Sequence, residues 1–451
     1  MADYTGTISA DVTLETGDTI GISGNTVIAS GYTMDATAGA IVSVYATRAF
    51  YPAVAADASI ELIGTESAPI TLQCQSADPD EDASAWSDVR NSTAGNLTLR
   101  YVKITNCEYG LNLLVTTGTL DVTKIWAEKC LQVMRTAGNV APVYTKIFGR
   151  DSYGWSLDGN NAAIDVAVSQ CWMERMVGHL SFDELGGGTN TLSDCVAKNG
   201  LSGSRNFLFQ DETEITMSDC WASLGSYGTY CQEANTNVTT IGNVFYKNAS
   251  YGNYSTSSAV ITSSYNDCIG AIVSGLYTNG GTLNSDYDSV AGNNYRPDTL
   301  YDVSADTQVG TVTSRTNAQS SPIKPLEVDN IAEGTPTTSA ITITFDCAAG
   351  TTSKRSTGLP FIKYGTVSGV YDMQSFLPDE SLWGLYWIEW YTDMAWASTG
   401  HSVTLSNLKD GTTYYYKCCW VDPLGRLAES TEGDFTTASG GTASTAIGLV
   451  G

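Results

Sequence analysis

The sequence predicts an all-β protein, with a parallel β-helix in the first two thirds of the chain and a β-sandwich near its C-terminus. Three observations lead to this prediction. A short pattern repeats at a nearly constant interval, each repeat carries alternating apolar residues, and the pattern changes after Pro322. Repeats of this length are typical of solenoids, and alternation is typical of half-buried strands.

The repeat is clearest at a set of cysteines. Ser152 and Val244 end two copies of the pattern, and cysteine ends the other copies, at Cys107, Cys130, Cys171, Cys195, Cys220 and Cys268. Successive ends are separated by 23, 22, 19, 24, 25, 24 and 24 residues. We expect these residues to form one inward-facing ladder of small side chains, repeated along the axis at about 4.8 Å.

Each repeat has room for three short strands and three turns. The positions five and three residues before the ladder residue are mostly apolar, as in Val102 and Ile104 or Ile215 and Met217. The two positions that follow are polar, as in Ser193-Asp194, which suits a corner. Each period is too short for a strand and a long helix, so it predicts one rung of a parallel β-helix.

Motifs upstream of the cysteines resemble a known superfamily. Gly64-Thr65, Pro69-Ile70, Trp86 and Leu99–Ile104 are similar to the entry segment of right-handed β-helices in the pectate-lyase-like superfamily. This resemblance implies a right-handed β-helix over residues 55–303, preceded by a cap or attachment segment over residues 1–54. It leaves the function open, because the superfold hosts lyases, hydrolases, adhesins and viral spikes.

A second domain is expected over residues 325–438, after a linker at residues 304–324. Apolar alternation at residues 340–345 and 361–366 predicts two of its strands. The segment from Leu405 to Tyr416 makes this region resemble a fibronectin type III domain, and the resemblance places a tyrosine corner at Tyr414/Tyr416. In that corner a tyrosine hydroxyl binds the backbone. Residues 439–451 are expected to form a flexible tail.

Charge and composition exclude some partners. The chain has 22 Lys and Arg against 48 Asp and Glu, giving a net charge of −26, whereas nucleic-acid binding needs a basic footprint. No signal peptide and no membrane-spanning stretch are visible, so we expect folding in a cytoplasm and no membrane insertion. If the ladder faces inward, its cysteines are reduced thiols rather than members of a disulfide framework.

Stacked carboxylates are the first candidates for catalysis. Asp194, Asp219 and Asp267 share one register in the repeat, with Asn243 between the last two. Adjacent rungs would place two of these carboxylates about 5 Å apart, as in a retaining glycosidase. The alternative is structural, because Asp, Asn and Ser suit corners by binding nearby backbone. We favour the structural interpretation and predict no catalytic residue.

Two further groups were weighed for chemistry. His179 with Asp183 and Glu184 has the composition of a small acid–base group, although a surface histidine beside loop acids is the simpler explanation. The acidic run at residues 78–82 has alternating carboxylates that suit calcium, but it lacks the glycine turn and distal glutamate of an EF-hand loop. No metal and no cofactor are therefore predicted.

An aromatic insert is the predicted ligand-binding region. It departs from the fibronectin pattern at residues 382–396 and contains Trp383, Tyr386, Trp387, Trp390, Tyr391 and Trp396. Exposed aromatic rings stack on sugars or anchor protein interfaces. Burial within the chain or within an oligomer is the alternative.

These features favour a non-enzymatic structural and attachment protein on the surface of a virion. The resemblance is to bacteriophage tailspikes, fibres and surface decorations, and it implies a homotrimer that contacts other virion proteins and a host-surface glycan or receptor. Two alternatives stay open. One is a polysaccharide depolymerase, a hydrolase or lyase acting on host glycan, and the other is a cellular adhesin.

Overall fold

The computed structural model of the chain divides into two units, residues 1–323 and residues 324–451. It describes residues 2–291, 309–312, 328–346, 359–374 and 400–439, with gaps at 22–23, 45–48, 53–56, 66, 75–87, 92–94, 108, 114–118, 131, 138–142, 153, 159–164, 177–179, 186–188, 201–202, 265, 270, 272–273, 287–288, 372 and 422–426. The described residues contain strands and turns but no helix, and hence no helix that would cross a membrane.

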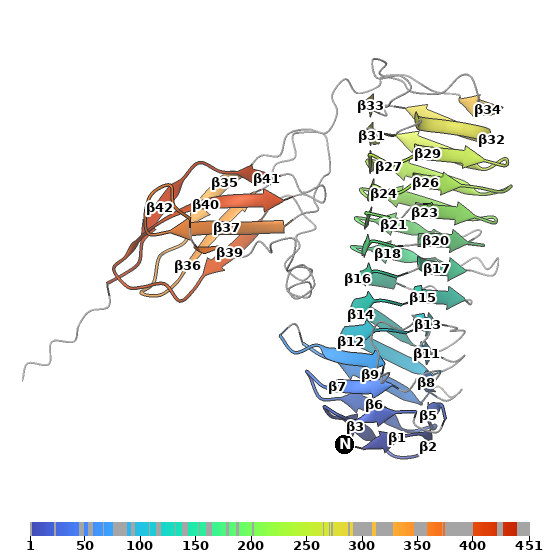
Figure 1. Cartoon of the computed structure of the whole chain (residues 1–451), viewed down its shortest axis with the longest axis horizontal. Helices are drawn as coiled ribbons and strands as arrows, with labels where there is room; N and C mark the ends of the chain where they lie inside the picture. The colour runs from blue at the N-terminus through green and yellow to red at the C-terminus, as the bar shows by residue number, and fades with distance from the viewer. Residues whose placement is uncertain are drawn as a thin grey trace, which may run out of the picture. The chain divides into compact units, whose positions relative to one another are not determined.

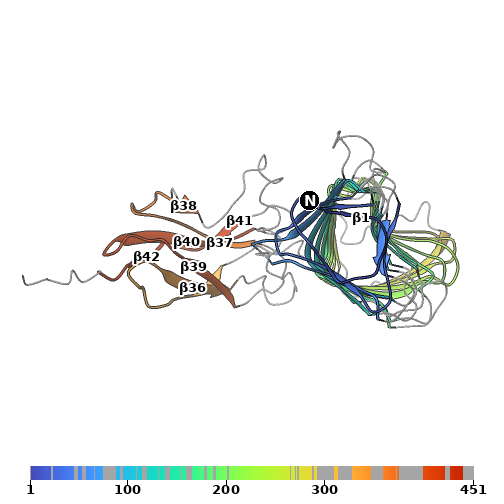
Figure 2. The ribbon, with the colours of Figure 1, turned by 90° about the horizontal axis from the view of Figure 1, so that it is seen from below.

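The first unit is a parallel β-solenoid, in which each rung contributes a strand to each of three faces (Figures 1 and 2). We name the faces A, B and C in chain order. Face A contains β1 (Asp3–Tyr4), β4 (Thr19–Ile20), β7 (Ile41–Val44), β10 (Ile70–Cys74), β19 (Trp172–Glu174), β22 (Val196–Lys198), β25 (Trp221–Ser223), β28 (Val244–Tyr246), β31 (Asp267–Ile269) and β33 (Ser289–Ala291).

Face B contains β2 (Gly6–Ile8), β5 (Thr26–Ile28), β8 (Ala49–Pro52), β11 (Asp88–Asn91), β13 (Tyr109–Leu113), β15 (Gln132–Ala137), β17 (Gly154–Asp158), β20 (Leu180–Asp183), β23 (Arg205–Gln210), β26 (Tyr227–Cys231) and β29 (Tyr251–Thr256). Face C contains β3 (Val12–Leu14), β6 (Thr33–Ala36), β9 (Ser59–Ile63), β18 (Ala167–Ser169), β21 (Thr191–Ser193), β24 (Glu214–Ser218), β27 (Asn237–Ile241) and β30 (Val260–Ser264).

Longer strands run through two faces. β12 (Asn96–Thr105), β14 (Leu120–Glu128) and β16 (Val143–Arg150) begin in face C and end in face A. β32 (Ser274–Asp286) begins in face B and ends in face C, where β34 (Val309–Val312) pairs with it. The parallel pairing already includes β1 and β4, so the solenoid begins with the first described strand.

Sharp corners separate the faces, because single residues there adopt a left-handed backbone. Between faces C and A these residues include Gln170, Asp194 and Asp219, with φ of 56°, 52° and 54°. Between faces A and B they include Asn106 and Asp151, with φ of 54° and 48°. Asn and Asp tolerate this conformation better than most residues do, which explains the polar corner positions of the repeat.

The inward positions form the core, as the alternation predicts. Val102, Ile104, Ile215 and Met217 are all buried in one continuous hydrophobic cluster. The described cysteines are free thiols and buried, as the ladder implied.

The prediction of one cysteine ladder is wrong, because the cysteines occupy two corners. Cys107, Cys130 and Ser152 follow the corner between faces A and B, and the Sγ atoms of Cys107 and Cys130 lie 2.9 Å apart. The pairing of Phe148 with Trp172 places Cys171 beside Ile147 instead of Ser152.

Cys171, Cys195 and Cys220 therefore form a second ladder, at the corner between faces C and A. The short interval of 19 residues is the step from one corner to the other. Cys268 belongs to neither ladder, because it pairs with Phe245 within face A.

The second unit contains two antiparallel sheets. One is formed by β35 (Asp329–Glu333), β36 (Ile341–Asp346) and β39 (His401–Leu405). The other contains β38 (Met373–Gln374), β37 (Leu359–Gly365), β40 (Thr413–Val421) and β41 (Leu427–Glu429), and β42 (Gly433–Thr436) also pairs with β40. Ile343 of the first sheet and Trp420 of the second share one hydrophobic core. The Lys409 N–H donates to the Tyr414 hydroxyl over 2.9 Å, which is the kind of bond expected at the corner.

Candidate functional site

Most of the predicted site residues lie outside the described residues. This holds for the six rings of the aromatic insert, Trp383, Tyr386, Trp387, Trp390, Tyr391 and Trp396, for His179 and for the acidic run at 78–82. Their roles stay predictions. Asp183 is described, and its carboxylate accepts a hydrogen bond from Gln210 on the next rung of face B.

The stack of corner carboxylates is shorter than the sequence predicted. Asp194 and Asp219 occupy equivalent corner positions on adjacent rungs, and the next corner is Gly242. The prediction is wrong for Asp267, which pairs with Val244 inside face A, and for Asn243, which follows the corner. The positive φ of both aspartates gives them a structural role in forming the bend. In the described part of the chain, no group of three or more metal-ligating side chains comes together.

Five tyrosines form a contiguous surface on the outer side of face B. They are Tyr227, Tyr230, Tyr251, Tyr254 and Tyr277, on β26, β29 and β32 (Figure 1), and we name them the tyrosine surface. The sheet register aligns Tyr227 with Tyr251, and it aligns Tyr230 with Tyr254 and Tyr277. Because parallel register places equivalent residues one rung apart, the rings form two short columns along the axis.

The rings of this surface contact one another closely. The centroids of Tyr251 and Tyr277 lie 4.4 Å apart with planes at 10°, and Tyr251 and Tyr254 lie 4.8 Å apart at 15°. Tyr230 is turned by 76° relative to Tyr227 at 4.9 Å. Tyr254 and Tyr277 are mostly covered, whereas Tyr227, Tyr230 and Tyr251 are partly exposed. The accessible part of the surface therefore belongs mainly to Tyr227, Tyr230 and Tyr251.

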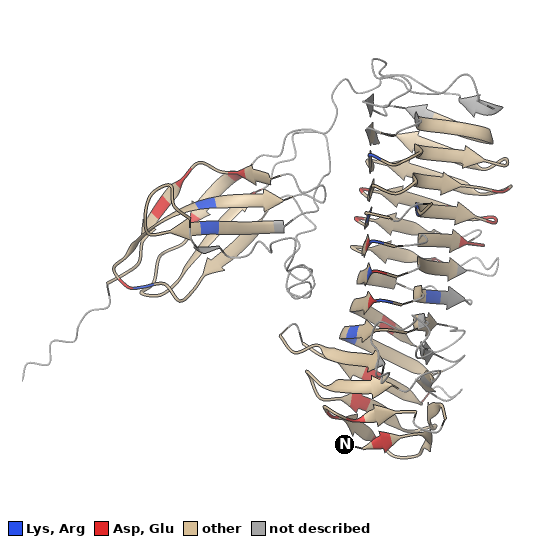
Figure 3. Ribbon diagram, in the orientation of Figure 1, with Lys and Arg blue, Asp and Glu red and all other residues tan. Residues whose placement is uncertain are grey.

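Polar side chains border the tyrosines. The guanidinium carbon of Arg205 lies 4.2 Å from the centroid of the Tyr230 ring, a cation–π contact. Gln232 donates to the side-chain oxygen of Gln210 over 3.0 Å, and Gln210 donates to the Asp183 carboxylate over 2.9 Å. The outer side of these rungs thus combines aromatic edges, amides, one carboxylate and one cation. Apart from Arg205, these face B strands carry few charges (Figure 3).

Packing of the tyrosines changes their acidity. Burial, followed by the neighbouring phenols of Tyr277, Tyr254 and Tyr227, raises the pKa of Tyr251 to about 12. Burial also raises the pKa of Tyr230, against the lowering effect of Arg205. The phenols of Tyr230 and Tyr251 therefore stay neutral hydrogen-bonding groups at physiological pH.

Glycines follow the first tyrosine of β26 and of β29, where neighbouring rungs approach closely. A Cβ atom at Gly228 would lie 2.5 Å from the Gly252 carbonyl oxygen, and one at Gly252 would lie 2.5 Å from the Gly275 carbonyl oxygen. These approaches exclude a side chain, so the glycines are required. The sequence carries a signal for this surface in Tyr227-Gly-Thr-Tyr and Tyr251-Gly-Asn-Tyr, which are spaced by one repeat, but these tyrosines were not among the predicted site residues.

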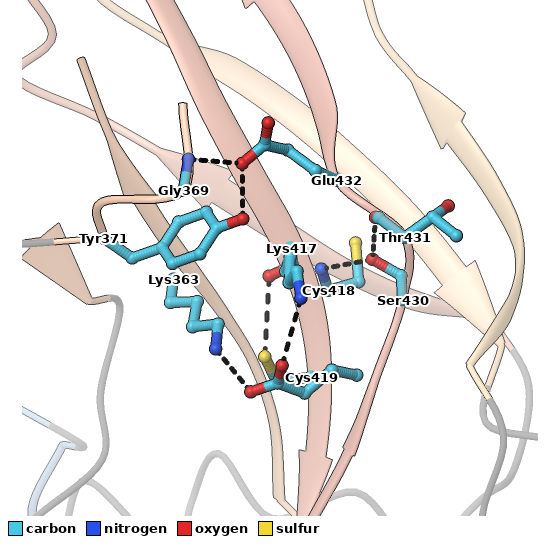
Figure 4. A network of polar contacts seen from close by, with 10 residues as sticks. Lys363, Gly369, Tyr371, Lys417, Cys418, Cys419, Ser430, Thr431 and Glu432 are labelled. Carbon is cyan, nitrogen blue, oxygen red and sulfur yellow. Dashed lines mark hydrogen bonds and ion pairs between the residues drawn. The ribbon is translucent and has the colours of Figure 1, made fainter. Parts of the chain in front are cut away.

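A polar network in the second unit holds a turn rather than forming a site (Figure 4). Glu432 accepts hydrogen bonds from the Gly369 N–H and the Tyr371 hydroxyl. It also accepts one from the Ser368 hydroxyl. The Ser368 bond is the largest cause that lowers the pKa of Glu432. Lys363 and Lys417 bond Glu429 and lie over the Tyr371 ring at 4.9 and 5.8 Å. Every group has a partner, so we assign this network to stability.

Comparisons with known proteins agree with the fold. Residues 6–90 match the family described as "Pectate-lyase like beta helix domain". The comparison with curated proteins finds no match. The matched segment spans β2 to β11, and the same parallel ladders continue through the later rungs to β34. The chain therefore contains a parallel β-solenoid whose first rungs are similar to a pectate-lyase-like β-helix domain.

Proposed function

We propose that this chain is a non-enzymatic attachment protein that contacts a surface glycan through the tyrosine surface. The observation that carries the proposal is the contiguous, partly exposed cluster of five tyrosines bordered by Arg205, Gln210 and Gln232. Sugars are recognised by aromatic rings together with neutral amides and hydroxyls, and this surface offers all of them. A pectate-lyase-like β-helix is consistent with a carbohydrate-binding or attachment role.

The cellular setting is also part of the proposal. A reduced, cysteine-containing solenoid with an acidic surface suits a protein that folds in a cytoplasm and acts outside it, as a structural protein of a bacteriophage virion does. Within such a particle, a homotrimeric spike, fibre or surface decoration is the arrangement we propose. The two antiparallel sheets and the Tyr414 hydroxyl bond support a fibronectin type III-like second unit.

Glycan binding tests the proposal directly. Purified protein should bind an array of bacterial surface polysaccharides, and Tyr227→Ala and Tyr251→Ala should each weaken that binding about tenfold or more, because stacked and edge contacts of one ring contribute roughly 1–3 kcal/mol at interfaces. Tyr246→Ala on face A of the neighbouring strand β28 is the matched control and should bind as wild type. Wild-type binding in both surface variants would contradict the proposal.

The same samples distinguish attachment from depolymerisation. We expect no new reducing ends and no unsaturated sugars after incubation of the protein with the bound polysaccharide. Cleavage that disappears in Asp194→Asn or Asp219→Asn would instead support the depolymerase alternative. Sedimentation equilibrium of the intact protein tests the trimer, and a monomer at micromolar concentration would contradict it.

A further inference from the structure

An arginine lies at one end of the tyrosine surface. Arg205 of β23 pairs in register with Tyr227, and Tyr227 pairs with Tyr251, so these three side chains follow one another from rung to rung at about 4.8 Å. The guanidinium carbon of Arg205 also lies 4.2 Å from the centroid of the Tyr230 ring. The column of tyrosines therefore continues into a cation that is held against one of its rings.

Arg205 has no acidic partner, unlike two other arginines of the solenoid. Arg150 and Arg175 both lie within ion-pair distance of the Asp151 carboxylate, at 3.4 and 2.5 Å. In the described part of the chain, the Arg205 side chain has the contact with the Tyr230 ring but neither an ion pair nor a hydrogen bond. Its N–H donors are therefore available to an anion from outside the chain.

Contact with a ring suits an arginine that binds an anion. A guanidinium that stacks on an aromatic ring keeps its planar fork of N–H donors, and this fork matches the oxygens of a carboxylate or a phosphate. Arg205 is half-buried, so its side chain is restrained but still reaches solvent. The neighbouring backbone is open as well, because Gly203 is exposed and no atom lies within 4 Å of the position of its Cβ.

The carboxylate that borders the tyrosine surface lies at the far end of the same strand. Asp183 pairs in register with Gln210 and accepts its hydrogen bond over 2.9 Å. Arg205 and Gln210 are the first and last of the six residues of β23, which places them roughly 16 Å apart. Charges at this separation are largely screened at physiological salt, so Asp183 does not neutralise Arg205.

We propose that Arg205 binds an anionic group of the glycan, a carboxylate or a phosphate, while Tyr227 and Tyr251 contact the sugar rings beside that group. The inference rests on the proposed glycan attachment and deepens it, since it identifies the glycan as acidic. The net charge of −26 repels a densely charged polymer. One cation is matched instead by one anionic group in each repeating unit of the polymer.

Removal of the anionic groups tests this inference on the intact protein. A polysaccharide that the protein binds is compared with its carboxyl-reduced form, in which every carboxylate has become a neutral alcohol, and with its dephosphorylated form. One of the two treatments should lower the affinity about tenfold, because a hydrogen-bonded ion pair is lost. A loss after reduction identifies the anion as a carboxylate, and a loss after dephosphorylation identifies it as a phosphate.

Variants of Arg205 localise the effect. Arg205→Gln should lower affinity for the untreated polysaccharide about tenfold and leave affinity for the neutralised form unchanged. Arg205→Lys keeps the charge but loses the fork, so its affinity should lie between those of wild type and Arg205→Gln. Arg100→Gln is the matched control and should bind as wild type, because it removes one positive charge from face C, where Arg100 already pairs with Asp121.

The outcomes separate the anion site from the proposed function. Equal affinity for the untreated and neutralised forms, or binding confined to neutral polysaccharides, overturns the anion site and leaves attachment through the tyrosine surface standing. If Arg205→Gln weakens binding of both forms equally, Arg205 only holds Tyr230 in place, which also overturns the site. Absence of binding to every glycan overturns the attachment function, and the anion site with it.

Discussion

The residues that follow the corner between faces C and A form one ladder, in which some rungs carry a cysteine and others an asparagine. The N–H of Cys171 donates to the Sγ of Cys195, and the N–H of Cys195 donates to the Sγ of Cys220, each over 3.4 Å. The N–H of Cys220 then donates to the Asn243 Oδ1 over 2.8 Å. Asn243 bonds Asn266 in the same way. The thiol and the amide thus have the same role. Each accepts a hydrogen bond from the backbone N–H of the ladder residue on the preceding rung.

This equivalence predicts which substitutions Asn243 tolerates. Asn243→Leu should destabilise the solenoid by roughly 2–5 kcal/mol, because the Cys220 N–H and the Met217 carbonyl would lose their partner while buried. Asn243→Cys should cost clearly less, because a thiol accepts the same N–H elsewhere in this ladder. Urea unfolding of the two variants measures the difference, and equal losses would contradict the assigned role of the thiols.

The tyrosine surface predicts a loss of stability at high pH. The pKa of Tyr251 is about 12 in the folded chain, against 10.0 for a free tyrosine. Between these values the unfolded chain releases the proton and the folded chain keeps it, so the folded state binds more protons. The contribution of Tyr251 to the free energy of unfolding is therefore fully present below pH 10 and is lost as the pH rises toward 12.

Tyr251→Phe isolates this contribution. At pH 8 the Tyr251 hydroxyl is protonated in both the folded and the unfolded chain. The difference in unfolding free energy between the variant and the wild type at this pH therefore measures what the neutral hydroxyl contributes. At pH 11.5 the same difference should shift in favour of the variant, because phenylalanine has no proton to lose. An identical difference at both pH values would show that Tyr251 titrates alike in the folded and unfolded states.

At the scale of the element, the sequence predicted the strands better than their register. Alternation at Val102 and Ile104 is a local signal, and it located the buried strand positions. Which of the two corners a residue occupies depends on how neighbouring rungs are paired. Both corners have a polar residue followed by a small one, so the local sequence does not distinguish them. The 19-residue interval before Cys171 was the only sign of the step between corners. The stack of three aspartates failed for a different reason. The corner after Asp219 is Gly242 and not Asn243, so the repeat slips by one residue and Asp267 falls inside face A.

The candidate site was harder to predict than the fold. The sequence analysis selected the densest aromatic run, the insert with Trp387, whereas the tyrosine surface is assembled from residues one rung apart. Tyr227 and Tyr251 become neighbours only when the register is known.

The glycine between the tyrosines allows a test at this scale. Gly252→Ala should destabilise the solenoid by about 1–3 kcal/mol, because the new Cβ would lie 2.5 Å from the Gly275 carbonyl oxygen and 3.1 Å from the Cys268 Sγ. Gly24→Ala is the matched control, since no atom lies within 4 Å of its Cβ position. Chemical denaturation should show almost no loss for the control. Equal stability of both variants would contradict the close approach of the rungs.

At the scale of the whole molecule, the acidic composition opposes folding, and the free thiols mean that non-covalent packing must offset it. The chain as a whole has a net charge of −26, and repulsion between like charges opposes compaction. The buried faces oppose it by non-covalent packing, because the nine described cysteines are free thiols. Stability along the solenoid therefore depends on register and burial, which each rung supplies to its neighbours.

We expect that a reductant does not change the stability of the chain. The nine described cysteines are buried, which shields them from reagents, and burial also raises the pKa of the Cys231 thiol, so that this thiol stays protonated in the folded state. The thermal midpoint should be the same with and without dithiothreitol. An aromatic disulfide reagent should react slowly with the native protein and rapidly after denaturation, when at least these nine thiols become accessible. A midpoint that falls with dithiothreitol, or fewer than nine thiols in the denatured chain, would show that disulfides hold the rungs.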